Sequence, residues 1–170
     1  MSEQIKNAIK TAIKLEINGR KFFNHAADIT QNERGQKMFR FLAEEEVKHL
    51  ETFGHLFSEI LKGDEWKKYV EKEDMAQESP LVEKLKERMK GAEGKSDIEA
   101  LSIGMELEKD AMSFFKRAAE ETDDPVAVKI FRKIFEEEQF HYDLLQAQYD
   151  SVTHSGFWLG SAEFQMDGKW

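Results

Sequence analysis

The chain repeats itself at a constant offset of 92 positions, and no other feature limits its possible folds as strongly. Several matched positions hold Leu, Phe or Ala, which any two amphipathic helices share. Three matched pairs are polar: Glu16 with Glu108, Glu46 with Glu138, and His49 with His141. General helix composition does not explain a matched Glu and a matched Glu-x-x-His at one offset. The repeat therefore predicts two helical hairpins of the same design.

Four long segments space their apolar residues three or four apart, as amphipathic helices do: about 3–29, 33–61, 97–121 and 125–150. Short breaks after the first and the third segment predict two antiparallel hairpins. The connection between the hairpins, residues 62–96, is long and holds one shorter helical stretch near residues 80–90. One long crossover in a four-helix bundle is the ferritin-like topology. We therefore predict an all-α, ferritin-like four-helix bundle over residues 1–150, with a short helix in its crossover.

The last segment, residues 151–170, differs from the bundle in composition. It places Phe157, Trp158, Phe164 and Trp170 among glycines. Disordered tails contain few aromatic residues, so we expect this one to pack on its own bundle or on a partner subunit.

Composition excludes several classes of function. The formal net charge of −9 disfavours nucleic acids and anionic membranes as partners, because both require an excess of Lys and Arg. The chain has no cysteine, which excludes disulfides, zinc fingers and iron–sulfur or rubredoxin-type centres. We find neither a signal-peptide pattern nor an apolar run of membrane-spanning length, and expect a cytoplasmic protein.

The matched acids fall on the apolar stripes of the four long helices. Each stripe is interrupted by one Glu, or by one Glu with one His three residues later. Glu16 and Glu46 each lie fifteen residues from Gln31, in the first break, and Glu108 and Glu138 lie equally far from the second. Each pair therefore sits at one level, roughly 22 Å from its turn. If the hairpins pack head to tail, the two pairs meet in the middle of the bundle.

Four carboxylates buried at one level need compensating charge. Arg20 is the one strong base near a stripe and cannot balance four acids, whereas two divalent cations can. The predicted ligands are these six residues: Glu16, Glu46, His49, Glu108, Glu138 and His141. Oxygen and nitrogen donors without sulfur favour iron or manganese over calcium or structural zinc. One Glu on two helices and Glu-x-x-His on the other two is the di-iron carboxylate arrangement.

These motifs resemble those of rubrerythrin and its relatives in the ferritin-like superfamily, over most of residues 5–150. The resemblance implies two bound iron ions, bridging by Glu46 and Glu138 or their partners, and reaction of the reduced centre with peroxide or dioxygen. Rubrerythrins usually carry a rubredoxin domain, but this chain has no cysteine, so a separate protein is expected to donate electrons.

Two further positions depart from the rubrerythrin pattern. Ala111 stands where rubrerythrins often have an extra Glu, so the site resembles the symmetrical six-ligand type of bacterioferritin. Tyrosines are usual beyond the ligands of the first and third helices. Phenylalanines stand there instead: Phe22, Phe23, Phe114 and Phe115. Glu45 and Glu137, each just before a ligand Glu, are candidates for orienting the metal-bound histidines through their other nitrogen, although either acid could equally be solvated.

The leading hypothesis is a homodimeric di-iron oxidoreductase that reduces hydrogen peroxide or oxidises Fe(II). Its four ligand glutamates would act through the metal centre. Manganese catalase-like disproportionation, iron storage and a metal-free helical interaction protein are the alternatives.

Overall fold

The computed structural model describes the chain except for residues 1–2, 62–64, 75–79, 91–95 and 161–170. The described residues form helices joined by short connections. These helices are α1 (Glu3–Ile29), α2 (Glu33–Leu61), α3 (Glu65–Asp74), α4 (Pro80–Met89), α5 (Ser96–Glu121) and α6 (Pro125–Ser155). Among them, no helix is both long and apolar enough to cross a membrane.

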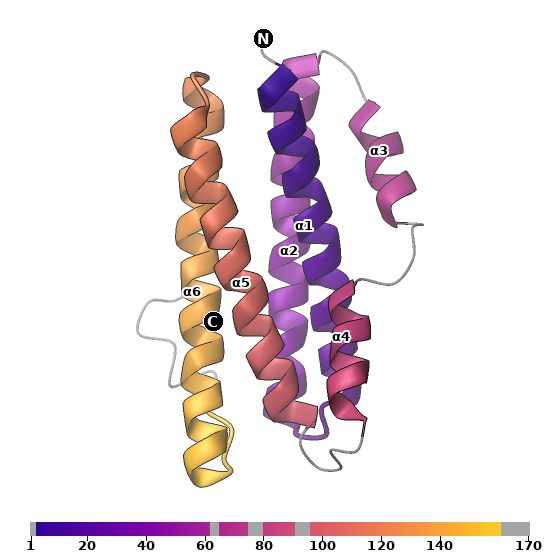
Figure 1. Cartoon of the computed structure of the whole chain (residues 1–170), viewed down its shortest axis with the longest axis vertical. Helices are drawn as coiled ribbons and strands as arrows, with labels where there is room; N and C mark the ends of the chain where they lie inside the picture. Colours follow the sequence, from indigo (N-terminus) through magenta and orange to yellow (C-terminus); the bar gives the residue numbers. More distant parts are fainter. Residues whose placement is uncertain (1–2, 62–64, 75–79, 91–95, 161–170) are drawn as a thin grey trace.

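The four long helices form two antiparallel hairpins, α1–α2 and α5–α6, that pack side by side. The turn of the first hairpin and the turn of the second lie at opposite ends of the bundle (Figure 1). The crossover returns along the bundle through α4, which packs against α1 and α5. This arrangement confirms the predicted all-α, ferritin-like bundle with head-to-tail hairpins.

Two details differ from the expectation. The described residues of the crossover form two short helices where one was expected, because the strongly charged segment α3 is also helical. Helix α6 also continues five residues past residue 150, to Ser155, where Gly156 ends it with a φ of 74°. At its start, the Asp124 carboxylate accepts hydrogen bonds from the amides of Val126 and Ala127, both at 2.9 Å.

Two apolar clusters fill the bundle. One lies toward the α1–α2 turn and includes Phe23, Phe39 and Leu144. The other lies toward the α5–α6 turn and includes Phe53 and Phe115, whose rings stack with centroids 5.5 Å apart. Every residue of the predicted ligand set is buried, and neither cluster includes any of them. The core is therefore two apolar halves with a polar layer at the level of the ligand set.

The chain after α6 folds back onto the bundle. Trp158 is 5% exposed and packs edge-on against Phe39, with ring centroids 6.1 Å apart. Arg34 donates a hydrogen bond to the Trp158 carbonyl at 3.1 Å. Gly35 makes room for the indole, because a Cβ there would lie 2.9 Å from the ring. The first residues of the aromatic tail thus pack on their own bundle, while Phe164 and Trp170 lie outside the described residues.

We expect Trp158→Ala to lower the free energy of unfolding by about 3 kcal/mol, since it empties a buried site that the surrounding helices cannot close. The matched control is Phe157→Ala, because Phe157 is 76% exposed and its removal should change stability little. Urea denaturation followed by circular dichroism measures both. Equal midpoints for the two variants would show that the tail does not contribute to the core.

Candidate metal centre

The structure brings all six predicted ligands together at the middle of the four long helices. Each of them is at most 2% exposed. They form two overlapping groups of four, Glu16-Glu46-His49-Glu138 and Glu46-Glu108-Glu138-His141. Within each group, one ligand atom from every residue lies within 4.8 Å of the others. Glu46 and Glu138 belong to both groups, so both ions of a bound pair would share these two carboxylates.

Both histidines turn Nδ1 toward the carboxylates. His49 Nδ1 lies 3.2 Å from Glu16 Oε2 and 3.3 Å from Glu138 Oε1. His141 Nδ1 lies 2.9 Å from Glu138 Oε2 and 3.6 Å from Glu108 Oε1. Glu138 therefore reaches one histidine with each of its oxygens. The two imidazole rings stack with centroids 5.8 Å apart, which sets the two halves of the centre side by side.

Gly19 is a site residue that the sequence pattern did not single out. A Cβ at this position would lie 2.9 Å from Oε2 of Glu46, so the missing side chain lets that carboxylate enter the centre. The repeat held a signal for it, because Gly19 and Ala111 are matched at the same offset of 92. Both are small residues three positions after a ligand Glu, on the face that the carboxylates occupy.

The buried carboxylates are not satisfied by the protein alone. Among the described residues, Glu16 Oε1, Glu46 Oε1 and both oxygens of Glu108 have no hydrogen-bond partner. Buried oxygen atoms without partners cost free energy unless something binds them. Two divalent cations would take up these lone pairs and balance four negative charges. The donor set thus fits the metal pair that the sequence predicted.

Burial and neighbouring charges shift the ionisation of the ligands. Burial, followed by repulsion from the other carboxylates, raises the pKa of Glu46 and the pKa of Glu108 well above the usual value. Burial would also raise the pKa of Glu138, but hydrogen bonds to His141 and His49 outweigh it and lower that pKa. For His49, burial is outweighed by the Glu16 charge and by a hydrogen bond to Glu137, so its pKa rises well above the usual value.

The outer nitrogen of His49 has a carboxylate partner. Nε2 donates a hydrogen bond to Glu137 Oε2 at 2.8 Å. Glu137 is one of the two residues that the sequence offered as candidates for orienting a histidine. The matched residue Glu45 instead bonds to Lys48, three residues further along α2. Within the described part of the chain, no hydrogen bond joins Glu45 to His141. The ring of His141 meets Phe41 and Phe140 edge-on. The two halves of the centre therefore have the same kinds of ligand but differ in what supports the histidines.

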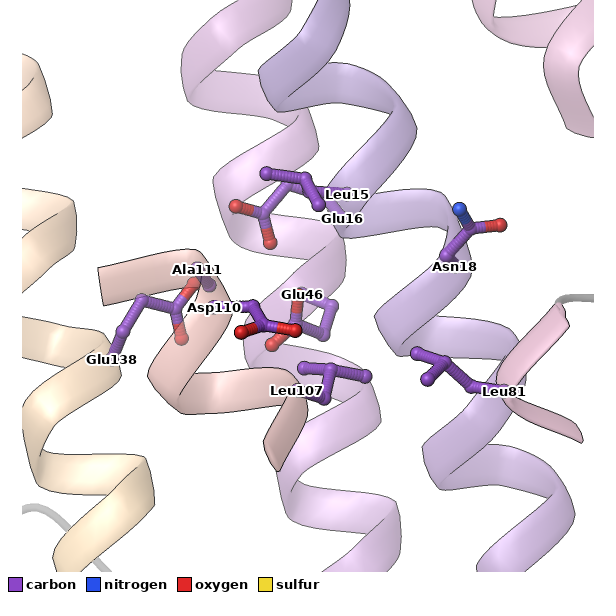
Figure 2. Close-up of a pocket in the computed structure, with 9 residues that line it drawn as sticks. All are labelled: Leu15, Glu16, Asn18, Glu46, Leu81, Leu107, Asp110, Ala111 and Glu138. Carbon is purple, nitrogen blue, oxygen red and sulfur yellow. The ribbon is translucent and has the colours of Figure 1, made fainter. Parts of the chain in front are cut away.

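A cavity of about 80 Å³ adjoins the carboxylates (Figure 2). Glu16, Glu46 and Glu138 reach it from α1, α2 and α6. Its other walls come mainly from apolar residues of α1, α4 and α5. The centre is therefore accessible to a small molecule on the side where α1 and α5 meet.

A family model for rubrerythrin matches residues 7–149. The chain belongs to the rubrerythrin family. This confirms the resemblance inferred from the ligand motifs, and with the buried Glu and His groups it fits a di-iron type of protein. A solved structure of a hypothetical protein from Pyrococcus furiosus is similar in fold, with a TM-score of 0.65 and 22% identity over 88% of this chain and 90% of that one. Among curated proteins, none matches the chain.

The raised pKa values predict how the stability of the metal-free protein depends on pH. In the folded protein, the pKa of Glu46 and the pKa of Glu108 lie above their usual value of 4.5, and the pKa of His49 lies above its usual value of 6.5. The folded state therefore holds more protons, and its stability falls as pH rises from about 5 to 8, by at most about 1.4 kcal/mol per pH unit for each proton.

Urea denaturation in a chelator at pH 5.5 and pH 8 measures this fall. The double variant Glu46→Gln, Glu108→Gln is the control, because its amides do not titrate and its stability should change less with pH. A metal-free protein that is equally stable at both pH values would contradict the charge balance described above.

His49 has a carboxylate partner in Glu137, whereas the matched Glu45 bonds to Lys48. We therefore expect the matched substitutions of Glu137 and Glu45 to have unequal effects. We expect Glu137→Gln to weaken binding of one metal ion by about 10- to 100-fold, because it removes the partner of a ligand histidine. Glu45→Gln should leave both affinities nearly unchanged, because Glu45 bonds to Lys48 instead. Titration with Co(II) or Fe(II), followed by calorimetry, gives the affinity of each site. Equal losses in the two variants would show that the two halves are equivalent.

Proposed function

We propose that this protein is a non-haem di-iron oxidoreductase that reduces hydrogen peroxide and receives its electrons from a separate donor protein. One observation supports it above all. The six buried ligands form two groups that share Glu46 and Glu138, which is the arrangement that a bridged metal pair requires. Iron is the metal proposed, since the donors are carboxylate and imidazole without sulfur, and manganese is the alternative that the same donors admit.

The six ligands would hold a pair of Fe(II) ions, which would supply the two electrons that, with two protons, convert one hydrogen peroxide molecule into two water molecules. The protein provides the rest of the site. Glu46 and Glu138 hold the two halves together, and Glu137 keeps the ring of His49 in place from outside. The apolar clusters on both sides of the polar layer exclude bulk water from the carboxylates.

Oxidation of Fe(II) by dioxygen is a second candidate, and Ala111 favours it. This residue carries only a methyl group where an additional carboxylate would enlarge the ligand set, and the set remains at six. A symmetrical set of six ligands is the type associated above with bacterioferritin. Which oxidant reacts faster with the reduced centre separates the two candidates.

The decisive experiment is a single turnover without a donor. Protein loaded anaerobically with about two Fe(II) per chain is mixed with one equivalent of hydrogen peroxide or dioxygen, and Fe(III) absorbance is followed by stopped flow. We expect faster oxidation by peroxide. Faster oxidation by dioxygen would favour the ferroxidase, and steady oxygen release from peroxide would favour a catalase.

Glu46→Ala tests the metal assignment in the same assay. It should lower bound iron below two per chain and slow oxidation at least about tenfold, because it removes a ligand common to both groups. Glu44→Ala is the matched control, since Glu44 lies two residues away on the exposed face of α2. Unchanged iron content in Glu46→Ala would overturn the assignment.

A further inference from the structure

The cavity beside the carboxylates has three distinct parts (Figure 2). Its floor consists of the carboxylates of Glu16, Glu46 and Glu138, which are buried. Its walls are apolar: Leu15 from α1, Leu81 from α4, and Leu107 and Ala111 from α5. Half-buried Asn18 and exposed Asp110 complete the lining and form its most solvent-exposed part, the rim. The cavity thus borders solvent-exposed polar residues, apolar walls and both of the shared ligands.

Ala111 is the residue that keeps this space open. Its repeat mate Gly19 is also small, but the carboxylate of Glu46 fills the space beside it. Beside Ala111, the corresponding space belongs to the cavity, which also borders Glu46 and Glu138. The two small residues of the repeat therefore have different neighbours: a ligand carboxylate occupies the space beside Gly19, and the cavity borders Ala111.

We propose that this cavity is the binding site through which a small neutral oxidant, hydrogen peroxide or dioxygen, reaches the centre, and that its leucine walls exclude organic hydroperoxides. The proposal rests on the proposed function, because it names the substrates that this centre receives. Hydrogen peroxide and dioxygen share the chemistry that matters here: both are uncharged and have two heavy atoms.

Size and charge both support this selection. A cavity of about 150 Å³ takes up benzene or xenon, and one water needs only about 10–15 Å³, so 80 Å³ suits a molecule of a few heavy atoms but not a phenyl-bearing hydroperoxide. Three carboxylates on the floor and Asp110 at the rim disfavour anions. The apolar walls offer no hydrogen bonds to a larger polar substrate.

Xenon tests the cavity without metal and without turnover. Crystals of metal-free protein under xenon pressure should show xenon against Leu107 and Ala111, since these residues belong to the apolar part of the cavity lining and xenon binds to apolar cavity surfaces. Ala111→Leu should abolish that density. Ser113→Leu is the matched control, because it adds the same side chain on the exposed face of the same helix and should keep the xenon. Absence of xenon in the wild-type protein would overturn the proposal.

Oxidation rates test the passage in iron-loaded protein. Ala111→Leu should bind about two Fe(II) per chain, as the ligand set implies, and should react with hydrogen peroxide and dioxygen about tenfold more slowly than Ser113→Leu. Equal rates in these variants at equal iron content would overturn the proposal, whatever the rate of the wild-type protein.

Size selection is tested by opening the wall. Wild-type protein should be oxidised by hydrogen peroxide at least about tenfold faster than by cumene hydroperoxide, and Leu81→Ala should narrow this ratio by about tenfold. Leu81 is half-buried and lies outside the ligand set, so its truncation leaves the centre in place. An unchanged ratio would show that the leucine wall does not select. If iron-loaded wild-type protein reacts with neither small oxidant, the proposed function fails, and the xenon result still decides whether the cavity binds small neutral molecules.

Discussion

Burial of four carboxylates in one layer is the constraint on which the rest of this structure depends. Each carboxylate alone would be expensive to bury, and together they repel one another. The two histidines relieve part of this strain, since Glu138 contacts His49 with one oxygen and His141 with the other. Oxygen atoms of Glu16, Glu46 and Glu108 nevertheless have no hydrogen-bond partner among the described residues. A layer of this kind costs free energy to bury, and bound cations would offset that cost.

The apolar halves of the core determine how that layer is held. Because the hairpins pack head to tail, each half of the bundle contains one turn and one set of helix ends. The stacked rings of Phe53 and Phe115 lie in one half, and Trp158 seals the other at the α1–α2 turn. Dense packing on both sides restricts the side chains of the layer to the positions that the helices leave them.

Two matched pairs of the repeat have different surroundings in the structure, and both differences bear on the centre. Glu137 supports His49, whereas Glu45 turns to Lys48 and leaves the ring of His141 between two phenylalanines. Gly19 and Ala111 likewise differ in what occupies the space beside them. The two hairpins therefore produce a centre with unequal halves: the half with His49 has an outer carboxylate partner, and all three of its carboxylates line the cavity.

The sequence by itself determined the helices, the hairpins and the level of the six ligands, because periodicity and distance from a turn are local properties of the chain. It also showed which residues are acidic on an apolar stripe. The tertiary structure alone decided that Glu46 and Glu138 are the shared carboxylates, that Glu137 rather than Glu45 reaches a histidine, and that Ala111 borders a cavity. These outcomes depend on the directions of side chains on helices that are far apart in sequence. A helix rotated about its axis by one residue would present other side chains to its neighbours, and the spacing of residues along the chain does not contain that information.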